Sequence, residues 1–264
     1  MDIDSFETVL FETGDDHVAT ITLNRPEVLN GFNFRMCEEF AAIWHRVKLD
    51  DSIHAVVLRA NGERAFCTGM DANDGFPPRY LPPNVWSQDD PSIYLSPKHN
   101  RVWKPLLCAV HGMVAGGAFY WLNEADIIVA ADDTTFFEPH VNYGIVASTE
   151  PRGLVRRAPL GEVLRMALLG LDERMSPKRA LEIGLVSEVV PRADLWSHVH
   201  ELASAIAAKP PAAVQGTVRA IWESLDMTRT QALSTSMAYT QIGNPLGQAQ
   251  LDPEKVRPPK WRLR

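Results

Sequence analysis

The chain opens with two runs in which apolar and polar positions alternate, FETVLFE (6–12) and HVATITL (17–23), joined by TGDD. Alternation with a period of two indicates strands that bury one face, so the pair predicts a β-hairpin. Three later runs are almost continuously apolar: IHAVVLRA (53–60), LLCAV (106–110) and DIIVAAD (126–132). Such runs are typical of strands buried on both faces, and they predict a parallel sheet covered by helices.

Helical periodicity separates and follows these strands. Residues 37–47 carry apolar side chains on one stripe, and another helix is expected near 98–102. The last third of the chain is mostly helical in pattern, with expected helices at 161–170, 176–184, 192–208, 211–226 and 228–242. Short extended segments are expected at 134–139 and 185–191. A hairpin, then strand–turn–helix units, then helices predict an α/β fold with an appended helical region.

Composition and charge narrow the function. The chain has 264 residues, 45% of them hydrophobic, which is enough for one sizeable core. Its net charge of −7 argues against a nucleic-acid binder, and no apolar run reaches membrane-spanning length. The acidic first residues lack the pattern of a signal peptide. Cys37, Cys67 and Cys108 are widely spaced without metal-ligand spacing, so we expect buried thiols in a reduced cytoplasm and no metal site.

Two glycine-bearing turns follow two successive core strands, CTGMD (67–71) and HGMVAGGAFYW (111–121). Glycine lets a ligand approach the backbone, and the first N–H groups of a helix lack partners within it. The N–H of Met70 and an N–H of the Gly116–Gly117 turn would together form a two-donor oxyanion hole. The alternative is that Gly116 and Gly117 only permit close packing between helix and strand.

Several blocks of sequence, in order, resemble the crotonase (enoyl-CoA hydratase/isomerase) superfamily. They are LNRPEVLNGFN, AFCTGMDAND, CAVHGMVAGGAFYWLNEADIIVAADDTTFFEP and ALEIGLVSEVVP. The resemblance implies a crotonase-like spiral of ββα turns over residues 1–200. It also implies a C-terminal helical region, 201–264, that forms homotrimers or dimers of trimers. The implied ligand is an acyl-CoA thioester, whose oxygen would accept hydrogen bonds from Met70 and Gly117.

The same resemblance implies where coenzyme A would bind as part of the substrate, with no further cofactor. The implied contacts come from two turns: Glu27, Val28 and Leu29 in the first, and Thr68, Asp71 and Ala72 in the second. Basic residues of the tail, Lys255, Arg257 or Lys260, would face the phosphates. The loop 75–97 would cover the acyl group with its aromatic residues Phe76, Tyr80, Trp86 and Tyr94, which could equally be packing anchors.

The chain departs from the family at both acid–base positions. Hydratases that it resembles carry a glutamate three residues after the oxyanion glycine and another after a proline in the next unit. Here these positions hold Tyr120 and His140, with Glu138 and Glu150 close in sequence to His140. A fifth candidate, Glu124, lies about one helical turn beyond Tyr120.

Each replacement has two interpretations. An imidazole titrates near neutrality and can serve as acid or base, so His140 is the candidate acid–base group, with Tyr120 and Glu150 beside it. The alternatives are a structural histidine and, for Tyr120, an aromatic residue that lines the acyl pocket. A phenol with a pKa of about 10 is a poor base, although it can donate a proton.

Three functions remain open from the sequence. The first is an acyl-CoA enzyme of the enoyl-CoA hydratase/isomerase kind that is not a standard hydratase. The second is a β-diketone or other carbon–carbon bond hydrolase or lyase, because PHVNYGIV (139–146) resembles that branch of the superfamily. The third is a protein that binds acyl-CoA without catalysis.

Overall fold

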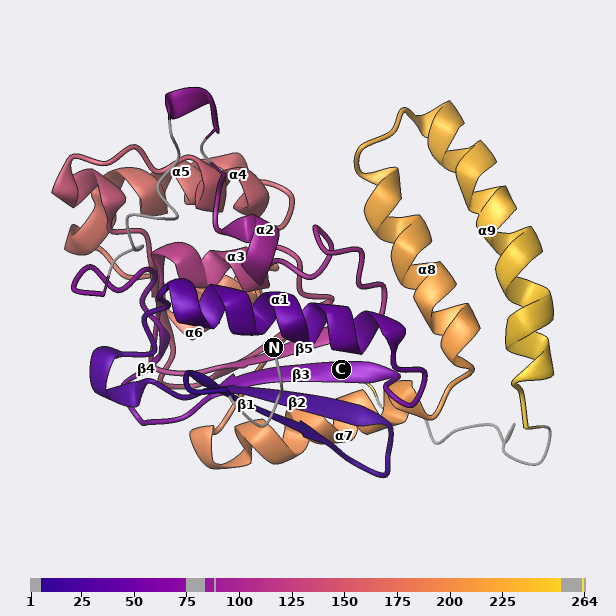
Figure 1. Ribbon diagram of the computed structural model, residues 1–264. Coiled ribbons are helices and arrows are strands. Elements are labelled where there is room, and N and C mark those ends of the chain that lie inside the picture. The colour runs from indigo at the N-terminus through magenta and orange to yellow at the C-terminus, as the bar shows by residue number, and fades with distance from the viewer. Residues whose placement is uncertain (1–5, 75–83, 88, 253–262, 264) are drawn as a thin grey trace.

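The computed structural model describes residues 6–74, 84–87, 89–252 and 263 (Figure 1). Phe76 and Tyr80 of the expected acyl cover, and the tail residues Lys255, Arg257 and Lys260, lie outside the described residues. Among the described helices, none combines the length and apolar character needed to cross a membrane.

A six-stranded sheet forms the centre of the molecule, with strand order β1-β2-β3-β5-β7-β9. The predicted hairpin is present as an antiparallel β1–β2 pair, and the remaining neighbours are parallel. The strands are β1 (Val9–Thr13), β2 (Val18–Leu23), β3 (Ala55–Ala60), β5 (Leu106–Val110), β7 (Ile127–Ala131) and β9 (Glu188–Val190). The three apolar runs are therefore the central parallel strands, as predicted.

A second, smaller parallel sheet has the order β4-β6-β8. Its strands are β4 (Ala65–Cys67), β6 (Met113–Ala115) and β8 (Thr135–Phe137). Each follows a strand of the large sheet in sequence, so the chain places one strand in each sheet per turn and winds as a spiral. This arrangement confirms the crotonase-like ββα core.

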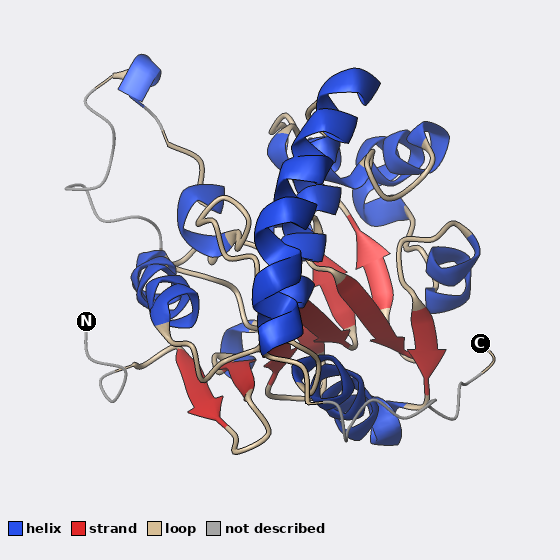
Figure 2. Cartoon of the chain, turned by 90° about the vertical axis from the view of Figure 1, so that its right-hand side faces the viewer, coloured by secondary structure: helices blue, strands red, loops and turns tan. Residues whose placement is uncertain are grey.

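Helices cover both faces of the large sheet (Figures 1 and 2). The helix α1 (Phe34–Leu49) lies on one face and buries its apolar stripe, and the Asn33 side chain caps its first turn by accepting from Met36 N. The helix α7 (Leu195–Ala207) packs on the opposite face against β3 and β5. Alternate residues of β3 serve the two faces: Val56 and Leu58 join the α1 core, whereas Ala55 and Val57 join the α7 core.

The last two helices, α8 (Pro211–Ser224) and α9 (Arg229–Ala249), form a hairpin beside the body of the protein (Figure 1). They pack mainly on each other, and Gly247 is the one buried residue within their described ranges. The expected boundary at residue 200 between the core and the helical region falls within α7 and stays a prediction.

The other helices are short: η2 (Pro26–Val28), η4 (Val85–Ser87), α2 (Ser92–Leu95), η5 (Gly116–Ala118), α3 (Phe119–Leu122), η6 (His140–Tyr143), α4 (Thr149–Leu154), α5 (Leu160–Leu169), η7 (Gly170–Asp172), α6 (Pro177–Glu182) and η8 (Arg192–Asp194). The prediction of a helix near 98–102 is wrong. The chain turns there instead, because Lys98 N and His99 N donate to the Glu124 carboxylate and Arg101 has a φ of 56°.

Candidate active site

The two glycine turns lie against each other at the ends of β4 and β6. A Cβ atom on Gly69 would stand 3.1 Å from Gly117 N, and a Cβ atom on Gly116 would stand 3.8 Å from Gly69 Cα. Gly69 has a φ of 95° and Gly116 a φ of 50°, which favour glycine. The positive φ angles therefore disfavour a side chain at either position, and an added Cβ atom at Gly69 would also crowd Gly117 N.

The backbone direction of Met70 follows from an isolated parallel bridge with Phe32. Phe32 N donates to Gly69 O at 2.9 Å, and Asp71 N donates to Phe32 O at 2.8 Å. In such a bridge the N–H of the middle residue points away from the partner strand, so Met70 N–H points away from Phe32. Gly117 lies in the first turn of η5, where N–H groups lack partners within the helix. Two unpaired donors from neighbouring turns can bind an oxyanion.

His140 lies beside these turns, between two carboxylates. Its Nδ1 hydrogen-bonds to Glu138 Oε1, and its Nε2 lies 3.9 Å from Glu150 Oε1. A Cβ atom on Gly116 would be 3.6 Å from His140 Cε1, so the imidazole reaches the glycine turn. The hydrogen bond to Glu138 is the largest cause that raises the pKa of His140, although partial burial opposes it. The imidazole is about a quarter exposed, which leaves it accessible to a ligand.

Glu138 is fully buried, with no exposed side-chain surface. Its Oε2 atom has no hydrogen-bond partner among the described residues. Because the Glu138 carboxyl is hydrogen-bonded to the His140 ring, it favours the charged form of the imidazole and raises its pKa. Glu138, His140 and Glu150 also offer metal-ligand atoms within 4.8 Å of one another, with His140 Nδ1 already bonded to Glu138.

Tyr120 connects to the same cluster through its hydroxyl. The Tyr120 hydroxyl lies 3.0 Å from Asp90 Oδ2 and 3.2 Å from Thr149 Oγ1, and Thr149 Oγ1 lies 2.8 Å from Glu150 Oε2. Burial, followed by the charge of Glu150, raises the pKa of the Tyr120 phenol well above its usual value. The ring also packs edge-on against Phe32 at 6.1 Å. Tyr120 therefore packs through its ring and joins, through its hydroxyl, a series of hydrogen-bonded polar side chains.

The structure thus brings Tyr120, His140 and Glu150 together, although they are far apart in sequence. Glu124 does not join them, because its carboxylate accepts from Lys98 N and His99 N at 2.6 and 3.1 Å. Sequence reasoning missed Asp90 and Thr149. Nothing in the motifs marks Asp90, whereas Thr149 could have been found as the polar neighbour of Glu150 in the first turn of α4.

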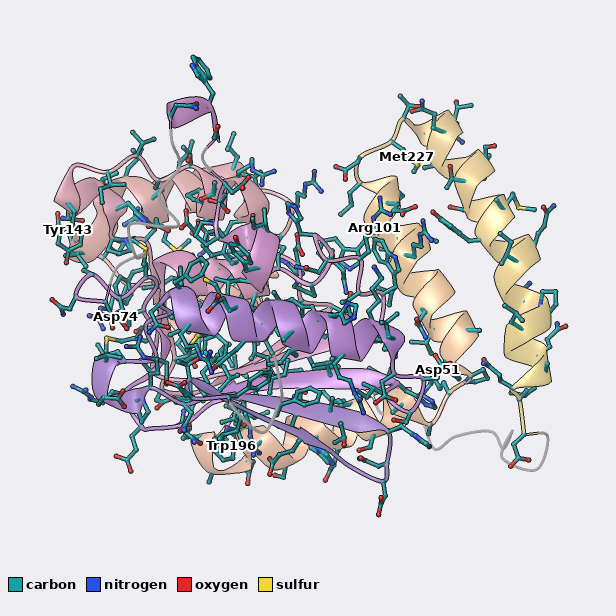
Figure 3. All side chains as sticks on the ribbon, viewed as in Figure 1. Asp51, Asp74, Arg101, Tyr143, Trp196 and Met227 are labelled. Atoms are coloured by element: carbon teal, nitrogen blue, oxygen red, sulfur yellow. The ribbon has the colours of Figure 1, made fainter. Side chains whose placement is uncertain are left out.

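The two turns expected to contact coenzyme A also meet. A Cβ atom on Gly31 would lie 3.5 Å from Asp71 Cα, and the Arg25 guanidinium bonds Asp71 Oδ2 at 2.9 Å. The turn with Glu27, Val28 and Leu29 therefore lies against the turn with Thr68, Asp71 and Ala72. Arg25 thus occupies the Asp71 carboxylate, and the Asp71 N–H is engaged by Phe32 O. Asp74, at the end of this second turn, lies across the body from the α8–α9 hairpin (Figure 3).

Cys67 stands next to the Gly69 turn but is buried and receives the Gly69 N–H at 3.4 Å. Burial raises the pKa of its thiol to about 12, so the thiol is not a nucleophile at neutral pH. Of the aromatic residues expected over the acyl group, Trp86 is 94% exposed. Tyr94 packs edge-on against Phe34 at 5.8 Å and is a packing anchor.

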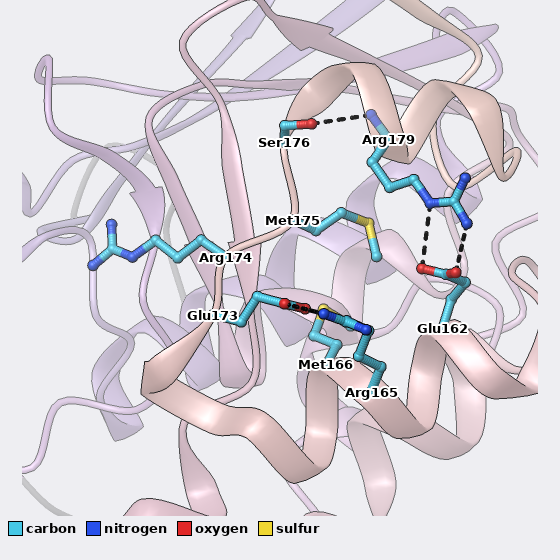
Figure 4. Close-up of a pocket in the computed structure, with 8 residues that line it drawn as sticks. All are labelled: Glu162, Arg165, Met166, Glu173, Arg174, Met175, Ser176 and Arg179. Atoms are coloured by element: carbon cyan, nitrogen blue, oxygen red, sulfur yellow. Dashed lines mark hydrogen bonds and ion pairs between the residues drawn. The ribbon is translucent and has the colours of Figure 1, made fainter.

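Two cavities bordered by described residues were compared with the candidate site. One, of about 280 Å³, borders Asp90, Tyr120 and Thr149 and extends to Trp222 of α8. The other, of about 380 Å³, lies between α5 and α6 (Figure 4). In the second, Arg165 pairs with Glu173 and Arg179 pairs with Glu162, while Arg174 points away from both pairs (Figure 4). The Arg165 and Arg179 side chains of the second cavity are thus paired with glutamates. The first cavity belongs with the candidate site, because Tyr120 and Thr149 border it.

Comparison with known proteins identifies the family of the chain. A sequence model described as enoyl-CoA hydratase/isomerase matches residues 13–242. The (E)-benzylidenesuccinyl-CoA hydratase of Thauera aromatica is 32% identical over 213 residues, covering 80% of this chain and 81% of that protein. The 1,2-epoxyphenylacetyl-CoA isomerase of Escherichia coli is 30% identical over 226 residues, covering 83% and 82%.

The similarity to this family extends to the three-dimensional structure. The crystal structure of an enoyl-CoA hydratase/isomerase from Mycobacterium paratuberculosis has a TM-score of 0.81 and 37% sequence identity, and the match covers 90% of each chain. The family match spans most of the chain, and the paired glycine turns lie on the spiral core that the family shares. The chain therefore belongs to the enoyl-CoA hydratase/isomerase family of the crotonase superfamily.

Proposed function

We propose that this protein is an enzyme that acts on an acyl-CoA thioester through an enolate held by the N–H groups of Met70 and Gly117. The observation that carries the proposal is the contact between the two glycine turns with His140 beside them. Negative charge grows on the thioester oxygen as the enolate forms, so fixed donors stabilise the transition state more than the substrate.

His140 and Glu150 supply the acid–base chemistry in place of two glutamates. Glu138 holds the imidazole by Nδ1, which leaves Nε2 toward Glu150, while Cε1 faces the Gly116 turn. The protonated imidazole donates a proton, and the Glu150 carboxylate accepts one. A pair made of one cation and one anion differs from two carboxylates, so we expect weak hydration of a simple trans-2-enoyl-CoA.

The ligand class has two supports. The turns that hold Val28 and Asp71 lie against each other beside the Gly69 turn, where the family resemblance leads us to expect coenzyme A. Both curated relatives described above carry a CoA thioester in their names. Coenzyme A would therefore enter as part of the substrate, with no additional cofactor.

A second candidate function is hydrolysis of a carbon–carbon bond in a β-dicarbonyl compound. The placement of His140 between Glu138 and Glu150 favours it, because a carboxylate-held imidazole can activate a water molecule. The same oxyanion site would then hold the enolate that leaves after carbon–carbon cleavage. Catalysis on a substrate without coenzyme A distinguishes this function from the first.

We further propose a homotrimer, alone or paired into a hexamer, that works in the cytoplasm. The α8–α9 hairpin leaves large apolar side chains more than half exposed, and nothing else in the described chain covers them. They are Ile221 (61%), Leu233 (65%), Met237 (52%), Ile242 (65%) and Leu246 (56%). Burying such a surface in a partner subunit is the ordinary solution.

The experiment compares wild type, His140→Ala and the control His45→Ala, a change of an exposed histidine on α1. Crotonyl-CoA hydration, cleavage of a β-diketone, and thermal stabilisation by CoA esters are measured for each. We expect stabilisation by CoA esters and slow hydration, with turnover lost in His140→Ala alone. Hydration by wild type at ordinary enzyme rates would refute the roles of Tyr120 and His140. Stabilisation without any product would indicate a binding protein.

A further inference from the structure

The Arg25 side chain joins the two turns that lie on either side of the Met70 donor. Its guanidinium uses two different nitrogens for two different segments of the chain. Nη1 donates to Gly31 O at 2.5 Å, and Nη2 donates to Asp71 Oδ2 at 2.9 Å. Gly31 directly precedes Phe32 in the chain, and Asp71 directly follows Met70. Arg25 therefore links the two segments right beside the isolated bridge between Phe32 and Met70.

This bridge is what aims the Met70 N–H. Phe32 N donates to Gly69 O at 2.9 Å, and Asp71 N donates to Phe32 O at 2.8 Å. Both bonds lie on the side of Met70 that faces Phe32, whereas the Met70 N–H points to the other side. The direction of this N–H therefore depends on how firmly the two segments are held together. The two bonds from Arg25 add a second attachment between them.

The turn that Arg25 holds has a backbone conformation that its residues do not favour. Leu29 and Asn30 have φ values of 56° and 54°, in the left-handed region where residues other than glycine are uncommon. The Asn30 side chain is fully buried, accepts from Arg25 N at 2.9 Å and donates to Ala65 O at 3.0 Å. Such a conformation persists only where the surroundings fix it, and it gathers at functional sites.

The segment that Arg25 holds also contacts the second half of the oxyanion site. A Cβ atom on Gly117 would overlap Phe32 Cε1, so the Phe32 ring lies directly against the Gly117 backbone. This ring is 1% exposed and packs edge-on against Tyr120. A displacement of Phe32 would therefore change the spacing between the Met70 and Gly117 donors.

We propose that Arg25 is a positioning residue for the oxyanion site. It sets the direction of the Met70 N–H by holding the turn at 28–31 against the turn at 69–71. The proposal rests on the proposed function, since the oxyanion site is what Arg25 orients. Donors stabilise an enolate only when their directions are fixed before the reaction begins. Arg25 acts through the backbone and needs no contact with the substrate.

The chemistry of the pair explains why the residue is an arginine. A guanidinium is planar and presents donors on separate nitrogens at fixed spacing, whereas a lysine places all its donors on one nitrogen. The Asp71 carboxylate uses both oxygens, because Oδ1 accepts from Asn73 N at 3.0 Å while Oδ2 accepts from Arg25. The side chains of Arg25 and Asp71 are only 14% and 5% exposed, so solvent and salt screen the pair weakly.

The first test reads the donors without turnover. Butyryl-CoA labelled with ¹³C at the thioester carbonyl is bound to saturation, and the carbonyl resonance moves downfield when hydrogen bonds polarise the carbonyl. We expect a downfield shift in wild type that is smaller in Arg25→Lys and in Asp71→Asn. The control Arg46→Lys, which alters an exposed ion pair with Asp50 at the end of α1, should keep the wild-type shift.

The second test measures exchange of the α-protons of butyryl-CoA in deuterium oxide. Arg25→Lys and Asp71→Asn should lower kcat by about 10- to 100-fold, since a misplacement of about 1 Å can cost about 100-fold. KM should change little, because an interaction that acts mainly in the transition state lowers kcat and kcat/KM together. A purely structural role would reduce the amount of folded protein and leave kcat per folded site unchanged.

A paired apolar variant separates positioning from folding. Arg25→Met combined with Asp71→Leu removes both charges together, so no buried charge is left without a partner. We expect this double variant to unfold near the wild-type temperature and still to lose most of the carbonyl shift. Wild-type shifts and exchange rates in all three variants would overturn the role of Arg25. A wild type without a downfield shift would refute the oxyanion site itself, and the proposal with it.

Discussion

Replacing Gly117 by alanine should damage the site and the fold together. A Cβ atom at this position would stand 2.3 Å from Phe32 Cε1, 2.9 Å from Phe32 Cζ and 3.2 Å from Tyr120 Cε2. The nearest approach is about 1.2–1.7 Å closer than an ordinary van der Waals contact between carbon atoms. Phe32 is 1% exposed and packs edge-on against Trp121 as well as Tyr120, so its ring has no free direction in which to move.

The Gly117→Ala change should lower both the stability of the protein and its catalytic rate. Overpacking of this kind destabilises a core by about 1–3 kcal/mol. For a chain of this length, each kcal/mol lowers the melting temperature by about 2–4 °C. Phe32 is hydrogen-bonded to Gly69 O and Asp71 N, so its displacement also moves Met70. Loss of one oxyanion donor lowers kcat by about 100- to 1,000-fold, and we expect at least this loss.

The assay combines thermal unfolding with α-proton exchange on an acyl-CoA. The control is Gly216→Ala in the exposed helix α8, where an added Cβ atom meets nothing within 4 Å. This control should gain about 0.5–1 kcal/mol from helix propensity and keep its activity. A Phe32→Leu change should relieve the clash, so the double variant should be more stable than the two single effects predict. A Gly117→Ala protein with the wild-type melting temperature and exchange rate would refute the reasoning.

Two further predictions concern the imidazole and the assembly. Glu138→Gln removes the main cause of the raised pKa of His140, so an NMR titration should show His140 losing its proton at a lower pH. The stabilisation from this pair is present at low pH and lost as the pH rises through the raised pKa of His140; an unchanged midpoint would contradict the assignment. Leu233→Glu on α9 should convert trimers to smaller species in sedimentation experiments, whereas a monomeric wild type would contradict the proposed trimer.

Much of the fold could be predicted from periodicity. The runs at 53–60, 106–110 and 126–132 are long and apolar, and each became a central strand as β3, β5 and β7. Of the smaller sheet, only β8 lies within an expected extended segment, 134–139. The strands β4 and β6 were not predicted, because strands of three residues carry too little pattern to distinguish them from turns. The helix expected near 98–102 failed because a distant carboxylate, Glu124, bonds the backbone there.

Some residues of the candidate site could likewise be predicted from the sequence, and others could not. Gly69 and Gly117 could be identified because each lies in a turn directly after a core strand, where a backbone donor can face a ligand. Their contact follows from the parallel pairing of neighbouring strands. Glu138 could be named beside His140 because the two are close in sequence, whereas the hydrogen bond between them comes from the structure. Asp90 could not be found, because it reaches Tyr120 through tertiary packing across 30 positions of sequence. Polar chains of this kind depend on side-chain directions that local patterns do not contain.

The central claim is that two backbone donors and a histidine–carboxylate pair stabilise an enolate of an acyl thioester. The measurement that tests it most directly is exchange of the α-protons of butyryl-CoA in deuterium oxide, because this substrate has no double bond and no group to lose. The account predicts exchange by wild type and its loss in both Gly117→Ala and His140→Ala. Absence of exchange in wild type, or exchange that persists in His140→Ala, would contradict it.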